Sequence, residues 1–332
     1  MRNNLNNQSR FISIGLMSGT SLDGVDVSII ESDGIKQFTR ILDRYYEYED
    51  KLTQKISKIR EKIKNLKDFD LNLNEIQDLE REITLFNAKV IKETLITSNF
   101  SIDIIGYHGQ TIFHDPSLKT SKQLGDAKLL SQLLKKNVIY NFRQNDLENG
   151  GQGAPLTPIF HNIIANKIKK DFNLEFPINI LNIGGIANVT ATVDEKNLWS
   201  KDKIYAYDIG PGNCLIDDWI KRNSKQKYDN DGMIASSGTV DSQILNQAYD
   251  NFNLNTFYET SLDVKDFDIF FARGLSLENG AATITEFTAK LISDGMKYLD
   301  KKNSKKKSNW LVCGGGRKNK YLFERIKKNF KD

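Results

Sequence analysis

Two glycine-rich stretches carry the residues best suited to chemistry in this chain. The first is Gly15-Leu-Met-Ser-Gly-Thr-Ser-Leu-Asp-Gly-Val-Asp26, and the second is Asn182-Ile-Gly-Gly-Ile-Ala-Asn188. Each lies between two β-rich segments, and glycines at such a tip let backbone N–H groups converge on an anion. Two such loops in different halves of one chain favour a nucleotide gripped from both sides of a cleft. The first interpretation is therefore a phosphotransferase.

The first loop offers contacts for phosphate and for metal. Its backbone amides and the hydroxyls of Thr20 and Ser21 could hold the β- and γ-phosphates of ATP, and Asp23 or Asp26 could orient Mg²⁺ through water. An ordinary hairpin is the alternative, because Asp-Gly is also a common tight-turn pair. The predicted nucleotide contacts are Gly19, Thr20, Ser21, Leu22, Asp23, Gly24, Val25 and Asp26, with Asp23 as the Mg²⁺ residue.

Two further glycine segments lie in the second half of the chain. Gly184 and Gly185 are predicted to contact the nucleotide; a hairpin is again the alternative, and the absence of a Lys excludes a Walker-type P-loop. The run Gly314, Gly315 and Gly316 follows a predicted strand over 310–313 and would let an adenine approach the backbone closely. For this run the alternative is a simple strand-to-helix turn.

Asp208 is the residue best placed to be catalytic. It lies at the end of a strand predicted over 203–207, immediately before a predicted loop. Gly210, Pro211 and Gly212 of that loop would fix the backbone and hold the carboxylate in place. A carboxylate with an ordinary pKa of about 4 is ionised at neutral pH and can act as a general base on water. The alternative is an Asp that only caps the helix that follows.

The elements that must position these residues alternate between strands and helices, which predicts an α/β fold. Apolar residues at steps of three and four predict an antiparallel helix pair within 52–90. Asn213 is a plausible N-cap. Strands are predicted over 102–107 and 137–142, and further helices over 158–169, 214–222, 241–251, 280–301 and 321–330.

A boundary between two domains is predicted near the middle of the chain. The segment Glu148-Asn-Gly-Gly-Gln-Gly-Ala-Pro155 combines turn-forming residues with a proline. We therefore predict a flexible arm over 1–10, an N-terminal domain with a helical insertion over 11–150, and a C-terminal domain over 151–332.

Composition narrows the class of protein. The 332 residues, 39% of them hydrophobic, suffice for two domains of ordinary size. The 47 basic and 43 acidic side chains nearly balance, so no nucleic-acid or membrane partner is expected, and the Lys-rich run 301–307 is interpreted as a solvated turn. No apolar run could cross a bilayer and residues 1–10 lack a secretion signal, which predicts a cytoplasmic protein whose Cys214 and Cys313 are reduced thiols.

The ordered motifs give the most specific indication. Gly19-Thr-Ser-Leu-Asp-Gly-Val-Asp26, His108-Gly-Gln-Thr, Gly150-Gly-Gln-Gly-Ala-Pro155, Asn182-Ile-Gly-Gly-Ile-Ala-Asn188, Asp208-x-Gly-Pro-Gly-Asn213 and Cys313-Gly-Gly-Gly316 follow one another along the chain. In this order they resemble the anhydro-N-acetylmuramic acid kinases of the acetate and sugar kinase, heat-shock protein and actin superfamily. The resemblance implies two actin-like (ribonuclease H-like) domains, with mixed sheets flanked by helices around an interdomain cleft.

The resemblance also implies a reaction. ATP, water and 1,6-anhydro-N-acetylmuramic acid become ADP and N-acetylmuramic acid 6-phosphate, a step in recycling the peptidoglycan of the cell wall. The expected partner is thus a small amino sugar, and a homodimer is allowed. Polar residues at strand ends would contact this sugar, although such residues often only stabilise loops; the candidates are His108, Gln110, Thr111, Arg143 and Asn213. With no third ligand at metal-like spacing, His108 and His114 do not predict a zinc site.

The chain departs from the family pattern at two places. Position 209 is Ile where members usually have Thr, which affects hydrogen bonding beside Asp208. Members also continue to a segment that contributes a glutamate to the sugar site, whereas this chain stops at Asp332, so its C-terminal domain is expected to lack the last segment. Two alternatives stay open: a kinase for another small sugar or carboxylate in which Asp208 deprotonates a hydroxyl directly, and an inactive nucleotide- or sugar-binding module.

Overall fold

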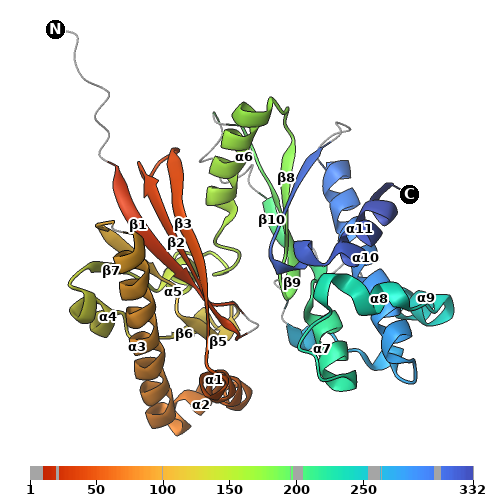
Figure 1. The fold of residues 1–332 in the computed structure, drawn as a ribbon, viewed down its shortest axis with the longest axis horizontal. Helices are drawn as coiled ribbons and strands as arrows, with labels where there is room; N and C mark the ends of the chain where they lie inside the picture. The colour runs from red at the N-terminus through yellow and green to blue at the C-terminus, as the bar shows by residue number, and fades with distance from the viewer. Residues whose placement is uncertain are drawn as a thin grey trace. The chain divides into compact units, whose positions relative to one another are not determined.

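The computed structural model describes residues 10–19, 22–98, 100–194, 196, 205–252, 262, 264–302 and 308–331. The chain forms two compact units, Met1–Leu156 and Thr157–Asp332, each of which is described by itself (Figure 1). Thr20 and Ser21 lie outside the described residues, as do the first residues of the strand predicted over 203–207 and most of the Lys-rich run over 301–307.

A mixed sheet forms the centre of the first unit, with the strand order β3-β2-β1-β4-β7. Strand β2 pairs antiparallel with both β1 and β3, whereas β4 runs parallel to β1 and β7 runs parallel to β4. Strands β5 and β6 form a separate hairpin. The strands are β1 Phe11–Met17, β2 Gly24–Ser32, β3 Phe38–Glu47, β4 Ile104–Tyr107, β5 Gln110–Asp115, β6 Thr120–Leu124 and β7 Asn137–Ile139.

The predicted helical insertion is present between β3 and β4. Its apolar stripes pack where the periodicity placed them, with Ile56 and Ile59 of α1 and Ile83 of α3 buried in one core with the sheet. Figure 1 shows α3 running alongside the strands and α1 and α2 at its lower end. The helices of this unit are α1 Asp50–Lys62, α2 Lys67–Leu71, α3 Leu73–Ser98, α4 Ala127–Leu134 and α5 Phe142–Glu148.

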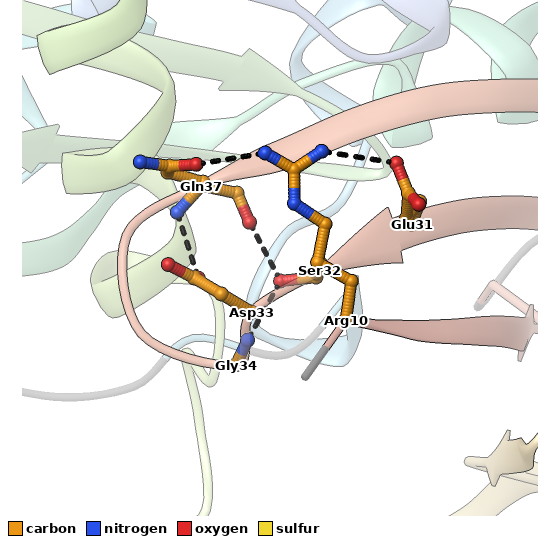
Figure 2. Close-up of polar contacts among 6 residues, drawn as sticks. All are labelled: Arg10, Glu31, Ser32, Asp33, Gly34 and Gln37. Atoms are coloured by element: carbon orange, nitrogen blue, oxygen red, sulfur yellow. Dashed lines mark hydrogen bonds and ion pairs between the residues drawn. The ribbon is translucent and has the colours of Figure 1, made fainter. Parts of the chain in front are cut away.

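The turn between β2 and β3 is closed by side chains (Figure 2). Asp33 is 8% exposed, and its Oδ1 accepts the N–H groups of the residues two, three and four positions later, each at 2.9 Å. These bonds lower the pKa of Asp33 against the opposing effect of its burial. Arg10 donates to Glu31 at 3.2 Å and to Gln37 at 3.1 Å, which ties the start of β1 to the same turn. These contacts fix the pairing of β1, β2 and β3 at the end of the strands opposite to the first glycine loop.

The second unit is built around a sheet with the strand order β10-β9-β8-β11. Strands β8, β9 and β10 are antiparallel, and β11 is parallel to β8. The strands are β8 Ile178–Ile183, β9 Ile186–Ala191, β10 Tyr205–Pro211 and β11 Asn309–Cys313. The helices are α6 Pro158–Phe172, α7 Cys214–Asn223, α8 Met233–Ser237, α9 Ser242–Asp250, α10 Leu277–Lys302 and α11 Lys320–Lys331.

Helices cover both faces of this second sheet. His161 of α6 lies 2.8 Å from the hydroxyl of Thr190 on β9, whereas the amide of Asn179 on β8 lies 3.5 Å from Asp300 of α10. Because Thr190 stands opposite Ile180 in the register, Thr190 and Asn179 point to opposite faces. Helix α6 therefore covers one face, and α10 with α11 covers the other (Figure 1).

Both units share one topology. In each, the first three strands form an antiparallel meander and a fourth strand pairs in parallel with the first, so that β3-β2-β1-β4 and β10-β9-β8-β11 have equivalent strand orders. This repeated mixed sheet flanked by helices confirms the predicted actin-like fold class. Among the helices that the structure describes, none is both long and apolar enough to span a membrane.

Candidate functional site

The first glycine loop joins β1 to β2 at the tip of a hairpin. A Cβ at Gly24, the first residue of β2, would lie 2.3 Å from a carbonyl oxygen of β3, so no side chain fits there. Leu22 has a positive φ of 59° and is 5% exposed. Val25 is buried, whereas Asp23 and Asp26 are exposed. The loop therefore anchors itself through apolar side chains and presents its carboxylates to solvent.

The loop carboxylates lie beside Tyr45, which stands opposite Asp26 in the pairing of β2 with β3. Burial raises the pKa of Tyr45, and the charges of Asp23, Glu47 and Asp26 raise it further, so the phenol stays a neutral hydrogen-bond donor. The described residues contain no group of three or more His, Cys, Asp or Glu able to hold a metal ion. The exposed carboxylates of this glycine loop do fit Mg²⁺, which takes one or two protein carboxylates and otherwise keeps water and substrate phosphates.

His108 and Arg143 form a fixed pair in the first unit. The Nε–H of Arg143 donates to Nε2 of His108 at 2.9 Å, and Nδ1 of His108 lies 2.7 Å from the carbonyl oxygen of Gly109. Only a protonated Nδ1 can donate to a carbonyl, so the ring is neutral with its proton on Nδ1. Burial lowers the pKa of His108 to about 4, and the charge of Arg143 adds to this. Arg143 also donates to the carbonyl oxygen of Gly153 at 2.8 Å, so its guanidinium is held from two sides.

The other two polar candidates of this unit lie at the start of β5. Gln110 is fully buried, and its Nε2 donates to the carbonyl oxygen of Gly19 at 2.9 Å. Thr111 is half-buried, and its hydroxyl accepts a long hydrogen bond of 3.4 Å from Gln123. The structure therefore brings Gln110 to the first glycine loop, a partner that lies 91 positions away in the sequence.

Three glycine-containing segments of the second unit meet at one edge of its sheet. The carbonyl oxygen of Gly185 accepts the N–H groups of Gly212 at 2.8 Å and of Cys214 at 3.2 Å. The carbonyl oxygen of Gly184 accepts the N–H of Asn213 at 2.7 Å. The turn between β8 and β9 thus sits on the amino end of α7.

The run Gly314-Gly-Gly316 completes this cluster. A Cβ at Gly314 would lie 2.4 Å from the carbonyl oxygen of Ile183, and one at Gly316 would lie 2.9 Å from Oδ1 of Asn213. Gly314 also has a positive φ of 84°, which a side chain would disfavour. A Cβ at Gly315, by contrast, would meet no atom closer than 3.9 Å. Gly314 and Gly316 therefore allow these segments to pack closely against one another.

Asn213 begins α7 as predicted but does not cap it. Its backbone has helical φ and ψ angles, and its side chain makes no capping hydrogen bond, so the predicted N-cap is wrong in that respect. The side chain instead lies against Gly315 and Gly316. The neighbouring thiols are both free, and burial raises the pKa of Cys214 to about 12 and also raises that of Cys313, so neither is a ready nucleophile.

Asp208 lies within a strand rather than after one. Strand β10 continues to Pro211, with an irregularity in its pairing between Asp208 and Gly210. The predicted loop is therefore a bulge in an edge strand, where proline is tolerated. Oδ2 of Asp208 accepts the N–H of Leu262 at 2.8 Å.

A polar row crosses the sheet at this level. Asp208 stands opposite Asn188, Asn188 opposite Asn182, and Asn182 beside Cys313. Residues paired in this way share one face of a sheet and have Cβ atoms about 5 Å apart. All four side chains are partly exposed, and Sγ of Cys313 lies 3.6 Å from Oδ1 of Asn182. The sequence motif contained Asn182 and Asn188, but sequence reasoning credited only its glycines.

The neighbouring Ile209 points to the opposite face and is fully buried. It packs against α10, where a Cβ at Gly295 would lie 2.6 Å from Cβ of Ile209. The residue that departs from the family pattern thus belongs to the core and not to the polar row.

Known proteins match the chain over nearly its whole length. The family model for anhydro-N-acetylmuramic acid kinase matches residues 11–332. The anhydro-N-acetylmuramic acid kinase of Pelagibacter ubique is 48% identical, covering 96% of this chain and 83% of its own length. Those of Zymomonas mobilis and Rhodopseudomonas palustris are 36% and 35% identical, covering 96% and 95% of this chain and 85% and 83% of their own lengths. The chain therefore belongs to the anhydro-N-acetylmuramic acid kinase family.

Proposed function

We propose that the glycine segments contact the nucleotide and that Asp208 is the general base of the kinase reaction. The family is named for the phosphorylation of anhydro-N-acetylmuramic acid. In the proposed reaction, ATP and water convert the 1,6-anhydro sugar into N-acetylmuramic acid 6-phosphate and ADP. The observation that carries the assignment is the convergence of Gly184-Gly185, the start of α7 and Gly314–Gly316 beside the polar row that ends in Asp208. A nucleotide there would lie next to a carboxylate.

The proposed chemistry couples hydrolysis to phosphorylation. The carboxylate of Asp208 takes a proton from water as the water oxygen attacks C1 of the sugar. The bond between C1 and the bridging oxygen breaks, and that oxygen keeps its bond to C6 together with the electron pair. The new 6-oxygen then attacks the γ-phosphorus, and ADP leaves. Phosphoryl transfer thus takes up the charge that ring opening creates, so no separate acid is required.

The first glycine loop supplies the second part of the proposal. Backbone N–H groups between Gly19 and Asp26 would bind the phosphates, and the adenine would approach the backbone at Gly315, where an added Cβ would meet nothing closer than 3.9 Å. Asp23 and Asp26 are exposed on the same loop, so either carboxylate is open to a metal bound to those phosphates. Mg²⁺ held by Asp23 through water would supply charge neutralisation on the phosphates.

Arg143 is proposed as the anchor for the sugar. Its guanidinium is oriented by His108 and by the carbonyl of Gly153, and an oriented guanidinium suits a carboxylate such as the lactyl group of muramic acid. His108 then acts on the sugar through Arg143. Thr111 and Asn213 are the remaining polar candidates.

The test is a coupled ADP-release assay with 1,6-anhydro-N-acetylmuramic acid, run in water labelled with heavy oxygen. We expect ADP and sugar phosphate in equal amounts, with one labelled oxygen at C1. Label at C1 separates this reaction from direct phosphorylation of a hydroxyl, which would leave C1 unlabelled. Nucleotide binding without ADP release would instead support the inactive binding module.

A further inference from the structure

The backbone of the first glycine loop is held from outside at three of its described residues. The carbonyl oxygen of Gly19 accepts from Nε2 of Gln110 at 2.9 Å, and that of Leu22 accepts from the hydroxyl of Thr53 at 3.0 Å. The carbonyl oxygen of Asp23 accepts from the backbone N–H of Tyr48 at 2.9 Å. These donors come from β5, α1 and the segment that follows β3, so three separate parts of the unit contact one short loop.

Each contact fixes the orientation of a peptide group. A trans peptide is planar, and its C=O and N–H point in opposite directions. When a carbonyl is tied back into the protein, the N–H of the same peptide must face the other way. Tying the carbonyls of Leu22 and Asp23 therefore turns the N–H groups of Asp23 and Gly24 away from these donors, and N–H groups that face outward are what an anion requires.

Leu22 shows that this arrangement is imposed on the chain. Its φ of 59° is a left-handed conformation that costs a side-chain-bearing residue energy and is uncommon outside Gly, Asn and Asp. The buried side chain of Leu22 and the hydroxyl of Thr53 hold it there. Strained backbone that the surroundings over-determine is a feature of ligand-binding loops.

The hydrogen bonds of Gln110 give a second indication that the surroundings impose the conformation of the loop. Only the amide nitrogen can donate to a carbonyl, so the bond to Gly19 fixes which end of the side chain is Oε1. That Oε1 is buried and has no hydrogen-bond partner among the described residues. A fully buried amide with one end unsatisfied is unfavourable for stability, so its presence is explained by what its other end does.

We propose that Gln110 and Thr53 are positioning residues that hold the first glycine loop in its phosphate-binding conformation. The proposal rests on the phosphate-binding role assigned to that loop above. It makes α1, part of the helical insertion, a support of the nucleotide site. It also gives Gln110 an effect on the nucleotide through the loop, in place of the sugar contact predicted from sequence.

The test uses Thr53→Val and Gln110→Met, which keep side-chain volume and remove the donor. We expect each to raise the KM for ATP and the dissociation constant for ADP about fivefold, the usual effect of one hydrogen bond, while the KM for the anhydro-sugar is unchanged. Thr97→Val on α3 is the matched control, because that hydroxyl bonds carbonyls of its own helix. Calorimetry with ADP measures binding without turnover.

Stability separates positioning from a purely structural role. Gln110→Met removes a hydrogen bond and also the unsatisfied Oε1, so the urea midpoint should stay close to that of the wild type. Unchanged ADP affinity in both variants would overturn the proposal, and so would a rise confined to the KM for the sugar. A wild-type chain that releases no ADP from ATP and anhydro-sugar would instead contradict the proposed function, and the ADP titration would still test the loop.

Discussion

Gly212→Ala is the sharpest perturbation of the glycine cluster in the second unit. The added Cβ would lie 2.2 Å from the carbonyl oxygen of Gly184, well inside any real contact, so the turn between β8 and β9 must move. Three hydrogen bonds join this turn to the start of α7, at 2.8, 2.7 and 3.2 Å. At about 1 kcal/mol each, their loss lowers the free energy of unfolding by about 2–3 kcal/mol. The same displacement should raise the KM for ATP by about tenfold or more, because the turn is a proposed nucleotide contact.

Gly315→Ala is the matched control for this change. Its Cβ would meet nothing closer than 3.9 Å, and both variants gain the same unfolded-state benefit of Ala over Gly, so their difference isolates the steric term. All 3 tryptophans lie between Thr157 and Asp332, so urea unfolding followed by tryptophan fluorescence reports on the second unit. Equal urea midpoints in the two variants would refute the steric reasoning. Because Gly315 is itself a proposed adenine contact, the KM for ATP of Gly212→Ala is compared with that of the wild type, and an unchanged value would remove the turn as a nucleotide contact.

Three further outcomes are expected. Asp208→Asn should lower kcat roughly 100-fold or more at nearly unchanged ADP affinity, and undiminished turnover would remove Asp208 as the general base. His108 should lower the free energy of unfolding of the first unit by about 3 kcal/mol between pH 6.5 and 4. The unfolded chain binds a proton near pH 6.5, whereas folded His108, whose pKa burial lowers to about 4, does not bind it until that pH. In His108→Gln, urea unfolding followed by circular dichroism should show a shallower dependence of stability on pH, and the dependence that remains includes His161 of the second unit, whose pKa burial also lowers to about 4. Glu286→Gln should lower the stability of the second unit by about 2 kcal/mol, because it breaks a buried ion pair with Arg325, whereas Asp231→Asn in an exposed pair should change little.

The sequence predicted the elements whose signals are local. Apolar periodicity located α1 and α3, and glycines marked the turns after β1, β8 and β11. Asp208 was misplaced because Gly210 and Pro211 are turn formers by composition. The structure keeps them in β10 because Gly210 pairs with Ala187 and Pro211 pairs with Ile186. Strand pairing at a sheet edge thus overrides the local turn propensity of these residues.

The contacts that the sequence did not reveal depend on distance along the chain or on register. Nothing local to Gln110 indicates that its amide reaches Gly19. The polar row depends on a single residue of register: a two-residue turn at Gly184-Gly185 would set Asn182 opposite Ala187, whereas the observed connection is one residue longer and sets Asn182 opposite Asn188. Since side chains alternate between faces, a slip of one residue would have removed Asn188 from the row.

The repeated topology explains why two glycine loops occur in one chain. Each joins the first two strands of its sheet, β1 to β2 in one unit and β8 to β9 in the other, so the loops are topologically equivalent. In both, loop carbonyls accept hydrogen bonds from outside the hairpin. The first unit uses side chains of Gln110 and Thr53 with one backbone N–H, whereas in the described part of the second unit the donors are backbone N–H groups at the start of α7.

This difference decides where each loop is vulnerable. A backbone N–H remains a donor after any substitution that keeps the helix, so substitution of the donor residue Cys214 should leave the second loop in place. Substitution of its glycine neighbours should disturb this loop, because an added Cβ would collide with backbone atoms. Side-chain donors vanish with one substitution, so the first loop can be weakened from α1 or β5 without change to the loop itself. We therefore expect substitutions outside the loop to change the proposed nucleotide contact of the first loop but not that of the second.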